Sequence, residues 1–352
     1  MWQLDNRTPF AAERTWVRDR NGAEIWLVAV KCTFDIKPDG TTEIAKDQPP
    51  PVMAPDYMDP SAPATSSLKY DMDLIRTKTT TDVIVLGHAY APSGKQVTET
   101  DVELRVGSIV KRLHVTGDRT WQGTSLSKPE PFATMPIIYE RAYGGFDPER
   151  RTTDRPQWDE RNPLGTGFAL SSSKIDGMKL PNIEYPDQLI RKWKDRPSPA
   201  GFGPICSHWQ PRARLAGTYD EKWQQQRLPL LPDDFDDRHH HCAPIDQQSP
   251  QFLSGGEPAA IINLTLDGVL RFSLPRIFLG FETFFYTGER QLHDRPKLHT
   301  VIIEPDFPRV SLVWHSALPC HPKVYKLNKT RIVQKQLVRL GPGTEIIDEE
   351  IA

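Results

Sequence analysis

Glu24-Ile-Trp-Leu-Val-Ala-Val-Lys-Cys-Thr-Phe34 is the stretch that decides the fold class. It is rich in β-branched and aromatic residues and has the length of a strand. The turn-forming pair Asn21-Gly22 precedes it, so the stretch predicts a buried β-strand. The run from Thr81 to Tyr90 (TDVIVLGHAY) has the same character and predicts a second strand. Residues 1–127 are therefore expected to be β-structure.

Alternating apolar and polar residues indicate further strands in both halves of the chain. The alternating runs come in pairs separated by short turn segments, and a period of two is typical of strands with one solvated face. The predicted pairs are residues 102–106 with 109–115 around Gly107-Ser108, residues 259–266 with 269–274 around Asp267-Gly268, and residues 300–304 with 309–314.

Residues 128–256, which we call the loop region, have a different composition. Aromatic, proline, glycine and aspartate residues dominate there, and the whole chain holds 33 prolines and 22 glycines. Proline is excluded from helix interiors and central strands, so this composition indicates ordered loops packed by their aromatic side chains. One short helix is expected near Pro186 to Lys194, because proline is favoured in the first turn of a helix.

These patterns predict a mainly β protein, with an antiparallel, sandwich-like β framework, a long central loop region rich in aromatic residues, proline and glycine, and little helix. We divide the chain into an N-terminal β region (1–127), the loop region (128–256) and a C-terminal β region with a charged tail (257–352). One compact unit is expected to span residues 1–322. In the tail, residues 323–339 are basic, and acidic residues cluster in 345–350.

Composition excludes several classes of protein. The 352 residues carry 46 acidic and 44 basic side chains, so no overall field exists to attract nucleic acid or an anionic membrane. Met1 to Arg20 lacks the apolar core of a signal peptide, and no apolar run is long enough to span a membrane. The four cysteines are widely spaced and are expected to be free thiols, which suits a reducing compartment. We expect a cytoplasmic protein.

The motifs of common catalytic sites are missing from the sequence. Gly165-Thr166-Gly167 and Gly201-Phe202-Gly203 lack the third glycine of a dinucleotide-binding loop, and no nucleophile elbow or zinc-protease helix occurs. Residues 233–242 (DDFDDRHHHC) hold carboxylates, imidazoles and a thiol, but consecutive histidines point to opposite faces of an extended chain. We predict no metal, no cofactor and no enzymatic activity. The alternative is a carbohydrate- or peptidoglycan-directed hydrolase that uses acidic residues in the loop region.

A series of short motifs with unusual composition is the most distinctive feature of the chain. They occur in a fixed order from Asn6 to about Trp314, and they include Asn6-Arg7-Thr8-Pro9-Phe10, Gly87-His88-Ala89-Tyr90-Ala91-Pro92, Gly117-Asp118-Arg119-Thr120-Trp121, Tyr139-Glu140-Arg141-Ala142-Tyr143-Gly144-Gly145, Arg161-Asn162-Pro163-Leu164-Gly165, Leu180-Pro181-Asn182-Ile183-Glu184, Pro199-Ala200-Gly201-Phe202-Gly203-Pro204, Trp209-Gln210-Pro211-Arg212 and Leu231-Pro232-Asp233-Asp234-Phe235. This order closely resembles a bacterial family associated with type VI secretion.

The resemblance implies a role and a partner. Members of the family resemble cytoplasmic adaptors or chaperones, typically encoded beside PAAR-repeat proteins, toxic effectors and the VgrG spike. The implied role is to hold a PAAR-containing effector and to help load it onto the spike. No catalytic residues come with the resemblance. A structural piece of the secretion particle is a further possibility.

Arginine, tyrosine and tryptophan are enriched at interface hot spots, so the motifs supply candidate partner contacts. The candidates are Arg119, Trp121, Glu140, Arg141, Tyr143, Asn182, Glu184, Trp209 and Arg212. The competing interpretation is that these residues hold the loops. Arginine side chains can pair with carboxylates and with loop carbonyls that have no strand partner.

Overall fold

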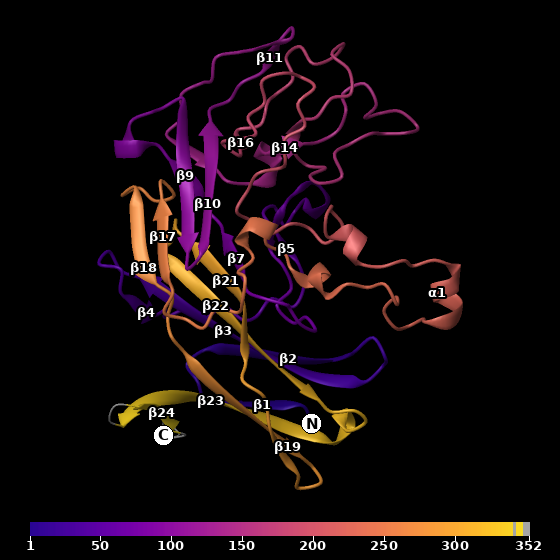
Figure 1. The fold of residues 1–352 in the computed structure, drawn as a ribbon, viewed down its shortest axis with the longest axis vertical. Helices are drawn as coiled ribbons and strands as arrows, with labels where there is room; N and C mark the ends of the chain where they lie inside the picture. Colours follow the sequence, from indigo (N-terminus) through magenta and orange to yellow (C-terminus); the bar gives the residue numbers. More distant parts are fainter. Residues whose placement is uncertain (341–342, 348–352) are drawn as a thin grey trace.

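Three β-sheets lie one above another and form the framework of the molecule (Figure 1). The computed structural model describes the backbone of residues 1–340 and 343–347 and the side chains of residues 1–335. Strands dominate the secondary structure, which confirms the prediction of a mainly β fold. Part of the acidic cluster predicted in 345–350, from position 348 onward, lies outside the described residues.

The middle sheet contains the stretch that begins at Glu24. This stretch forms β3, and its residues from Trp26 to Phe34 are all buried, so apolar side chains are favoured on both faces. The parallel pairing of β21 with β7 departs from the antiparallel expectation. The strands in order are β2 (Ala11–Arg18), β3 (Glu24–Ile36), β22 (Arg309–Pro319), β21 (Lys297–Glu304) and β7 (Asp82–Val85), with β4 (Thr42–Ile44) beside β3.

The upper sheet is built from the other predicted strand pairs. The predicted turn at Gly107-Ser108 is confirmed, since Val106 pairs with Ile109. In the second pair the turn is longer than expected, because strand pairing ends at Ile262 with Val269. The strands in order are β16 (Ile183–Glu184), β10 (Ile109–Thr116), β9 (Glu99–Val106), β17 (Pro258–Ile262) and β18 (Val269–Ser273).

The lower sheet brings the two ends of the chain together. The first strand runs parallel to a long strand that lies in the predicted basic tail, so the residues after 322 contribute to the framework. The strands in order are β1 (Gln3–Asn6), β23 (Leu327–Leu340), β19 (Phe278–Phe285) and β20 (Arg290–Leu292), with β24 (Gly343–Ile347) beside β23.

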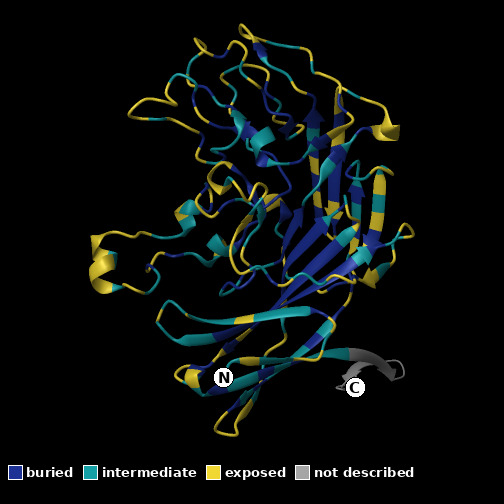
Figure 2. Ribbon diagram, turned by 180° about the vertical axis from the view of Figure 1, so that it is seen from behind, coloured by how far each residue is buried: buried dark blue, intermediate teal, exposed yellow. Residues whose placement is uncertain are grey.

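One apolar cluster joins the three sheets. It contains Val30 of the middle sheet, Leu104 and Leu113 of the upper sheet, and Phe281 and Ile332 of the lower sheet. Figure 2 shows the buried residues concentrated along the middle sheet, between the other two. The sheets therefore share one core, as the sandwich-like prediction requires.

The loop region has little regular structure. Short strand pairs in and around it are β5 (Asp56–Tyr57) with β6 (Leu68–Tyr70), β8 (His88–Tyr90) with β13 (Thr134–Pro136), β11 (Trp121–Gln122) with β12 (Ser125–Leu126), and β14 (Tyr143–Gly144) with β15 (Thr166–Gly167). The one α-helix among the described residues is α1 (Glu221–Gln226), which lies on an arm that projects from the sheets (Figure 1).

Two predictions about local structure were wrong. No helix forms at Pro186 to Lys194, because side chains capture its backbone: Glu184 accepts a hydrogen bond from the Ile190 N–H at 2.6 Å. The run from Thr81 to Tyr90 is not one strand. It leaves the middle sheet after Val85, and residues 88–90 pair with β13 instead.

No helix in the part of the chain that the structure describes is both long and apolar enough to cross a bilayer.

Candidate functional site

Two of the candidate contacts meet at Asp118, above the end of the upper sheet. The Arg141 guanidinium donates to the Asp118 carboxylate and to the Asn182 carbonyl oxygen, both at 3.0 Å. The Asn182 amide also donates to Asp118 at 2.9 Å. The hydrogen bond from Asn182 and the charge of Arg141 together lower the pKa of Asp118. The three side chains fix one loop to another.

Arg119 and Glu184 form a second, more deeply buried pair. Their side chains are 11% and 1% exposed and are joined by an ion pair. Burial raises the pKa of Glu184, and the charge of Arg119 acts in the opposite direction. The other Glu184 oxygen accepts the Ile190 N–H, so this carboxylate is used internally.

Trp121 and Tyr143 belong to an apolar cluster that is separate from the core shared by the sheets. Both are buried, and they pack with Ile175, Leu180 and Ile190. Desolvation raises the pKa of the Tyr143 hydroxyl to about 12. Neither side chain offers surface to a partner in this conformation.

The remaining candidates lie elsewhere. Trp209 is buried against Tyr139, with ring centroids 5.7 Å apart. Arg212 is also buried and bonds the Asp71 carboxylate at 2.8 Å. Glu140 is half-buried and accepts hydrogen bonds from the N–H and hydroxyl of Ser67 at 2.6 and 2.8 Å. Only Arg119, Glu140 and Arg141 among the candidates keep some exposed surface.

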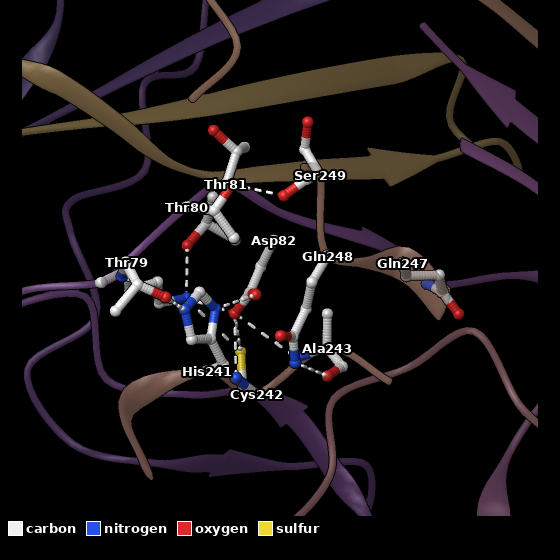
Figure 3. A network of polar contacts seen from close by, with 12 residues as sticks. Thr79, Thr80, Thr81, Asp82, His241, Cys242, Ala243, Gln247, Gln248 and Ser249 are labelled. Carbon is white, nitrogen blue, oxygen red and sulfur yellow. Dashed lines mark hydrogen bonds and ion pairs between the residues drawn. The ribbon is translucent and has the colours of Figure 1, made fainter. Parts of the chain in front are cut away.

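A buried polar network that sequence reasoning missed joins the loop region to the middle sheet (Figure 3). Asp82, on β7, is fully buried and bonds Lys78 Nζ and His241 Nδ1, both at 2.6 Å. The Cys242 N–H donates to the same carboxylate at 2.9 Å, and Lys78 also donates to Thr300 at 2.9 Å. Asp82 lies in a predicted strand and His241 in the histidine run, but nothing in the sequence reveals that they meet.

The charges within this network are balanced. Burial opposes ionisation of Asp82, but the charge of Lys78 and the His241 hydrogen bond outweigh it and lower its pKa. Burial also raises the pKa of the Cys242 thiol, so the sulfur stays protonated. The Thr79 N–H donates to His241 Nε2 at 3.2 Å, so the ring proton lies on Nδ1, facing Asp82. The arrangement resembles a catalytic Asp–His pair, but its ring nitrogens are already used to hold the 79–82 segment.

Two of the three consecutive histidines in the stretch considered for metal binding have different partners. His241 bonds Asp82, whereas His239 Nδ1 lies 2.9 Å from the Arg212 carbonyl. Among the described residues, no group of three or more His, Cys, Asp or Glu side chains is placed to hold a metal ion.

Lys111 makes a second buried connection, between the upper sheet and the loop region. Its ammonium donates to the Gly201 carbonyl at 2.7 Å, to Gln247 at 2.8 Å and to Asp246 at 2.9 Å. Desolvation lowers the pKa of Lys111 to about 8, and the nearby Asp246 carboxylate limits the shift. Both buried connections tie the same segment, around residues 241–247, to the sheets.

Glu140 also lines a surface hollow of about 460 Å³, which we call the acidic groove. Apolar side chains form much of its lining, and among them Phe307 is 72% exposed and Met58 is 41% exposed. The other apolar lining residues are Leu86, Pro136 and Ile138, and the acidic ones are Asp59, Glu140, Glu304 and Asp306.

Tyrosine hydroxyls hold two of the four carboxylates of the acidic groove, Glu304 and Asp306, in place. Tyr90 donates to Asp306 at 2.8 Å, and His88 Nδ1 lies 2.8 Å from the other oxygen of the same carboxylate. Tyr70 donates to Glu304 at 2.5 Å. Burial and the Asp306 hydrogen bond raise the pKa of Tyr90 to about 12, so this donor stays protonated. The groove is an apolar surface with four carboxylates and one basic side chain, Lys69, in its lining.

The model of one known family matches most of the chain. Residues 21–315 match the model of a bacterial family described as an uncharacterized protein conserved in bacteria, DUF2169. The chain belongs to this DUF2169 family. The match runs from the turn before β3 to His315 in β22, so it includes the acidic groove and leaves out β1, β2 and β23. No curated protein and no solved structure matches the chain.

Proposed function

We propose that this DUF2169 protein is a cytoplasmic adaptor of type VI secretion, which holds a PAAR-containing effector and helps to load it onto the VgrG spike. It acts by binding and not by catalysis. The ordered motifs from Asn6 to about Trp314 support this role through their resemblance to secretion-associated proteins.

The acidic groove is the observation that carries the proposal. A chaperone must cover client surface that is apolar or unstable alone, and Phe307 and Met58 offer exposed apolar area beside a hollow. An anchor in a hollow surrounded by fixed polar groups is the usual plan of an interface hot spot. The client segment should therefore combine an apolar anchor with basic or hydrogen-bond-donating neighbours.

Co-purification with the effector encoded beside the gene tests the proposal. Wild-type protein should retain the effector, and Phe307→Ala should reduce the affinity about tenfold or more. Leu266→Ala is a matched control, because Leu266 is 79% exposed at the tip of the β17–β18 hairpin and lines no part of the groove. Equal capture by the two variants would place the contact elsewhere. Failure of the wild-type protein to bind any PAAR-containing effector would contradict the role itself.

Salt dependence separates an apolar contact from an electrostatic one. The net charge is −2, so long-range steering contributes little and most of the affinity should come from the apolar lining. Capture should survive an increase from about 0.1 to about 0.5 M salt. Complete loss over this range would mean that the carboxylates dominate the contact.

A further inference from the structure

The lower sheet has an open strand edge beside a cavity. β19 pairs with β23 along its length, but on its other side β20 pairs only with residues Glu282 to Phe284. One more hydrogen bond, from the His293 N–H to the Phe281 carbonyl at 3.0 Å, continues this ladder. Before Phe281, no strand of the described residues is paired with this edge of β19.

The open edge presents backbone groups in a strand geometry. In an antiparallel strand the N–H and C=O of one residue point to the same side, and every second residue repeats that direction. Because Phe281 bonds toward β20, Leu279 directs its N–H and C=O toward the same side. Unpaired outward N–H and C=O groups of this kind are a template for an added strand.

A cavity of about 430 Å³ lies along this edge and is lined by both faces of β19, by residues 292–296 and by β23. Phe281 and Trp314 form part of its apolar wall, and Leu292 at its mouth is 75% exposed. Trp314 is itself 4% exposed, and its indole N–H has no hydrogen-bond partner in the described structure. The cavity therefore offers apolar area to an incoming side chain.

The lining of the cavity holds three basic and two acidic side chains. Arg295, Arg331 and Lys335 line it, and Arg331 bonds Asp5 at 3.2 Å. Arg295 is exposed and makes no hydrogen bond or ion pair with the rest of the described chain. The acidic residues of the lining are Glu282 and Asp294, so basic side chains are in excess. An acidic segment is the complementary ligand.

We propose that the open edge of β19 binds an extended strand of a partner protein, in which apolar and acidic side chains alternate. The strand would hydrogen-bond the outward N–H and C=O of Leu279. Its apolar side chains would enter the cavity against Phe281 and Trp314, and its carboxylates would meet Arg295 and Lys335. This site is separate from the acidic groove, and the proposal does not depend on the type VI role.

A peptide of about ten residues with alternating valine and glutamate is the probe, titrated into the full-length protein. The matched ligands are the same peptide with lysine in place of glutamate, and a peptide N-methylated on alternate backbone nitrogens. N-methylation removes ladder donors and leaves the protein unchanged. The lysine peptide should bind about tenfold or more weakly, and so should the peptide methylated in the register whose N–H groups face β19. Equal binding of the N-methylated peptide in both possible methylation registers would rule out strand addition.

Two variants test the location of the site. Leu292→Asp should weaken peptide binding about tenfold, whereas Leu266→Asp, at a similarly exposed leucine away from the cavity, should leave it unchanged. On peptide binding, hydrogen exchange of the Leu279 amide should slow by about tenfold, because it becomes a ladder donor. Unchanged exchange at Leu279, or equal effects of the two variants, would overturn the proposal. The proposal would also be overturned if the protein forms a dimer and Leu292→Asp abolishes that dimer, since a second copy would then occupy the edge.

Discussion

The upper sheet and the loop region are ordered in different ways. In the upper sheet, the β9–β10 hairpin pairs every residue from Glu99 to Thr116 outside its turn, so the backbone satisfies itself. In the loop region, side chains satisfy the backbone groups instead. Asn162, for example, donates to the Tyr139 carbonyl at 2.7 Å and to the Tyr143 carbonyl at 3.0 Å. A loop without ladder partners needs specific side chains to satisfy its backbone.

This difference changes how the conspicuous motifs are interpreted. The arginines, asparagines and acids of the loop region stand out because each fits one structural position. Arg119, Asn182 and Glu184 are examples of side chains used mostly internally. Phe307 and Met58, which offer exposed apolar area, belong to ordinary-looking segments. The candidate contacts stay predictions, and Glu140 and Arg141 are the best placed of them to touch a partner.

Removing Asp82 should have the largest effect, because it breaks the connection between the loop region and the middle sheet. Asp82→Asn leaves the buried Lys78 ammonium without its counter-charge, which should cost about 3–5 kcal/mol of unfolding free energy. Denaturant-induced unfolding measures this loss of free energy. The double variant Lys78→Met/Asp82→Asn should recover part of the loss.

A matched control for Asp82 is Glu43→Gln, in the exposed ion pair of Glu43 with Lys37. This change should leave the denaturation midpoint nearly unchanged. Similar small effects of Asp82→Asn and Glu43→Gln would mean that the network does not hold the two regions together.

Tyr143 and Arg141 are near neighbours in sequence and should separate scaffold from contact. Tyr143→Ala removes a fully buried ring and should cost about 3–4 kcal/mol of stability. The side chain of Arg141 is 34% exposed, so Arg141→Ala should lower the unfolding free energy by about 1 kcal/mol or less. Thermal melting and effector affinity should be measured on each single variant. A loss of affinity in Arg141→Ala at unchanged melting temperature would identify a direct contact.

Acid should destabilise the framework through its buried histidines. Desolvation lowers the pKa of His293 and of His315 to about 4. In the unfolded chain these rings take up protons near pH 6.5, whereas in the fold they stay neutral down to about pH 4. The unfolded state therefore binds more protons in this window, and stability falls as pH is lowered through it.

Each of these imidazoles should contribute about 1.4 kcal/mol per pH unit between pH 6 and pH 4.5. Unfolding free energies measured across this range check the slope. His315→Gln should flatten it. An equal slope in the variant would show that other groups cause the acid sensitivity.

Much of the framework could be predicted from sequence because its information is local. Alternation and turn residues define the hairpin of residues 99–116 and the pairing of Glu304 with Arg309. The parallel pairs of β1 with β23 and of β21 with β7 join distant segments without a local signal. The helix expected at 186–194 failed because Glu184 competes for its backbone. A side chain from outside a segment cannot be read from that segment's own pattern.

The candidate site was less predictable for the same reason. Asp82 and His241 are 159 positions apart and meet only in the folded chain. The acidic groove likewise combines segments near residues 58, 87, 138 and 306. Sequence patterns identified Glu140, but not the surface that it helps to form.

Hydrogen exchange of the protein with and without its effector tests the central claim most directly. The account predicts slower exchange at the acidic groove, in the segments 58–66 and 304–307, and unchanged exchange at the buried motif of residues 182–184. Protection of residues 118–121 and 182–184 with no change at the groove would contradict it. The motifs would then be the contact surface and not the scaffold.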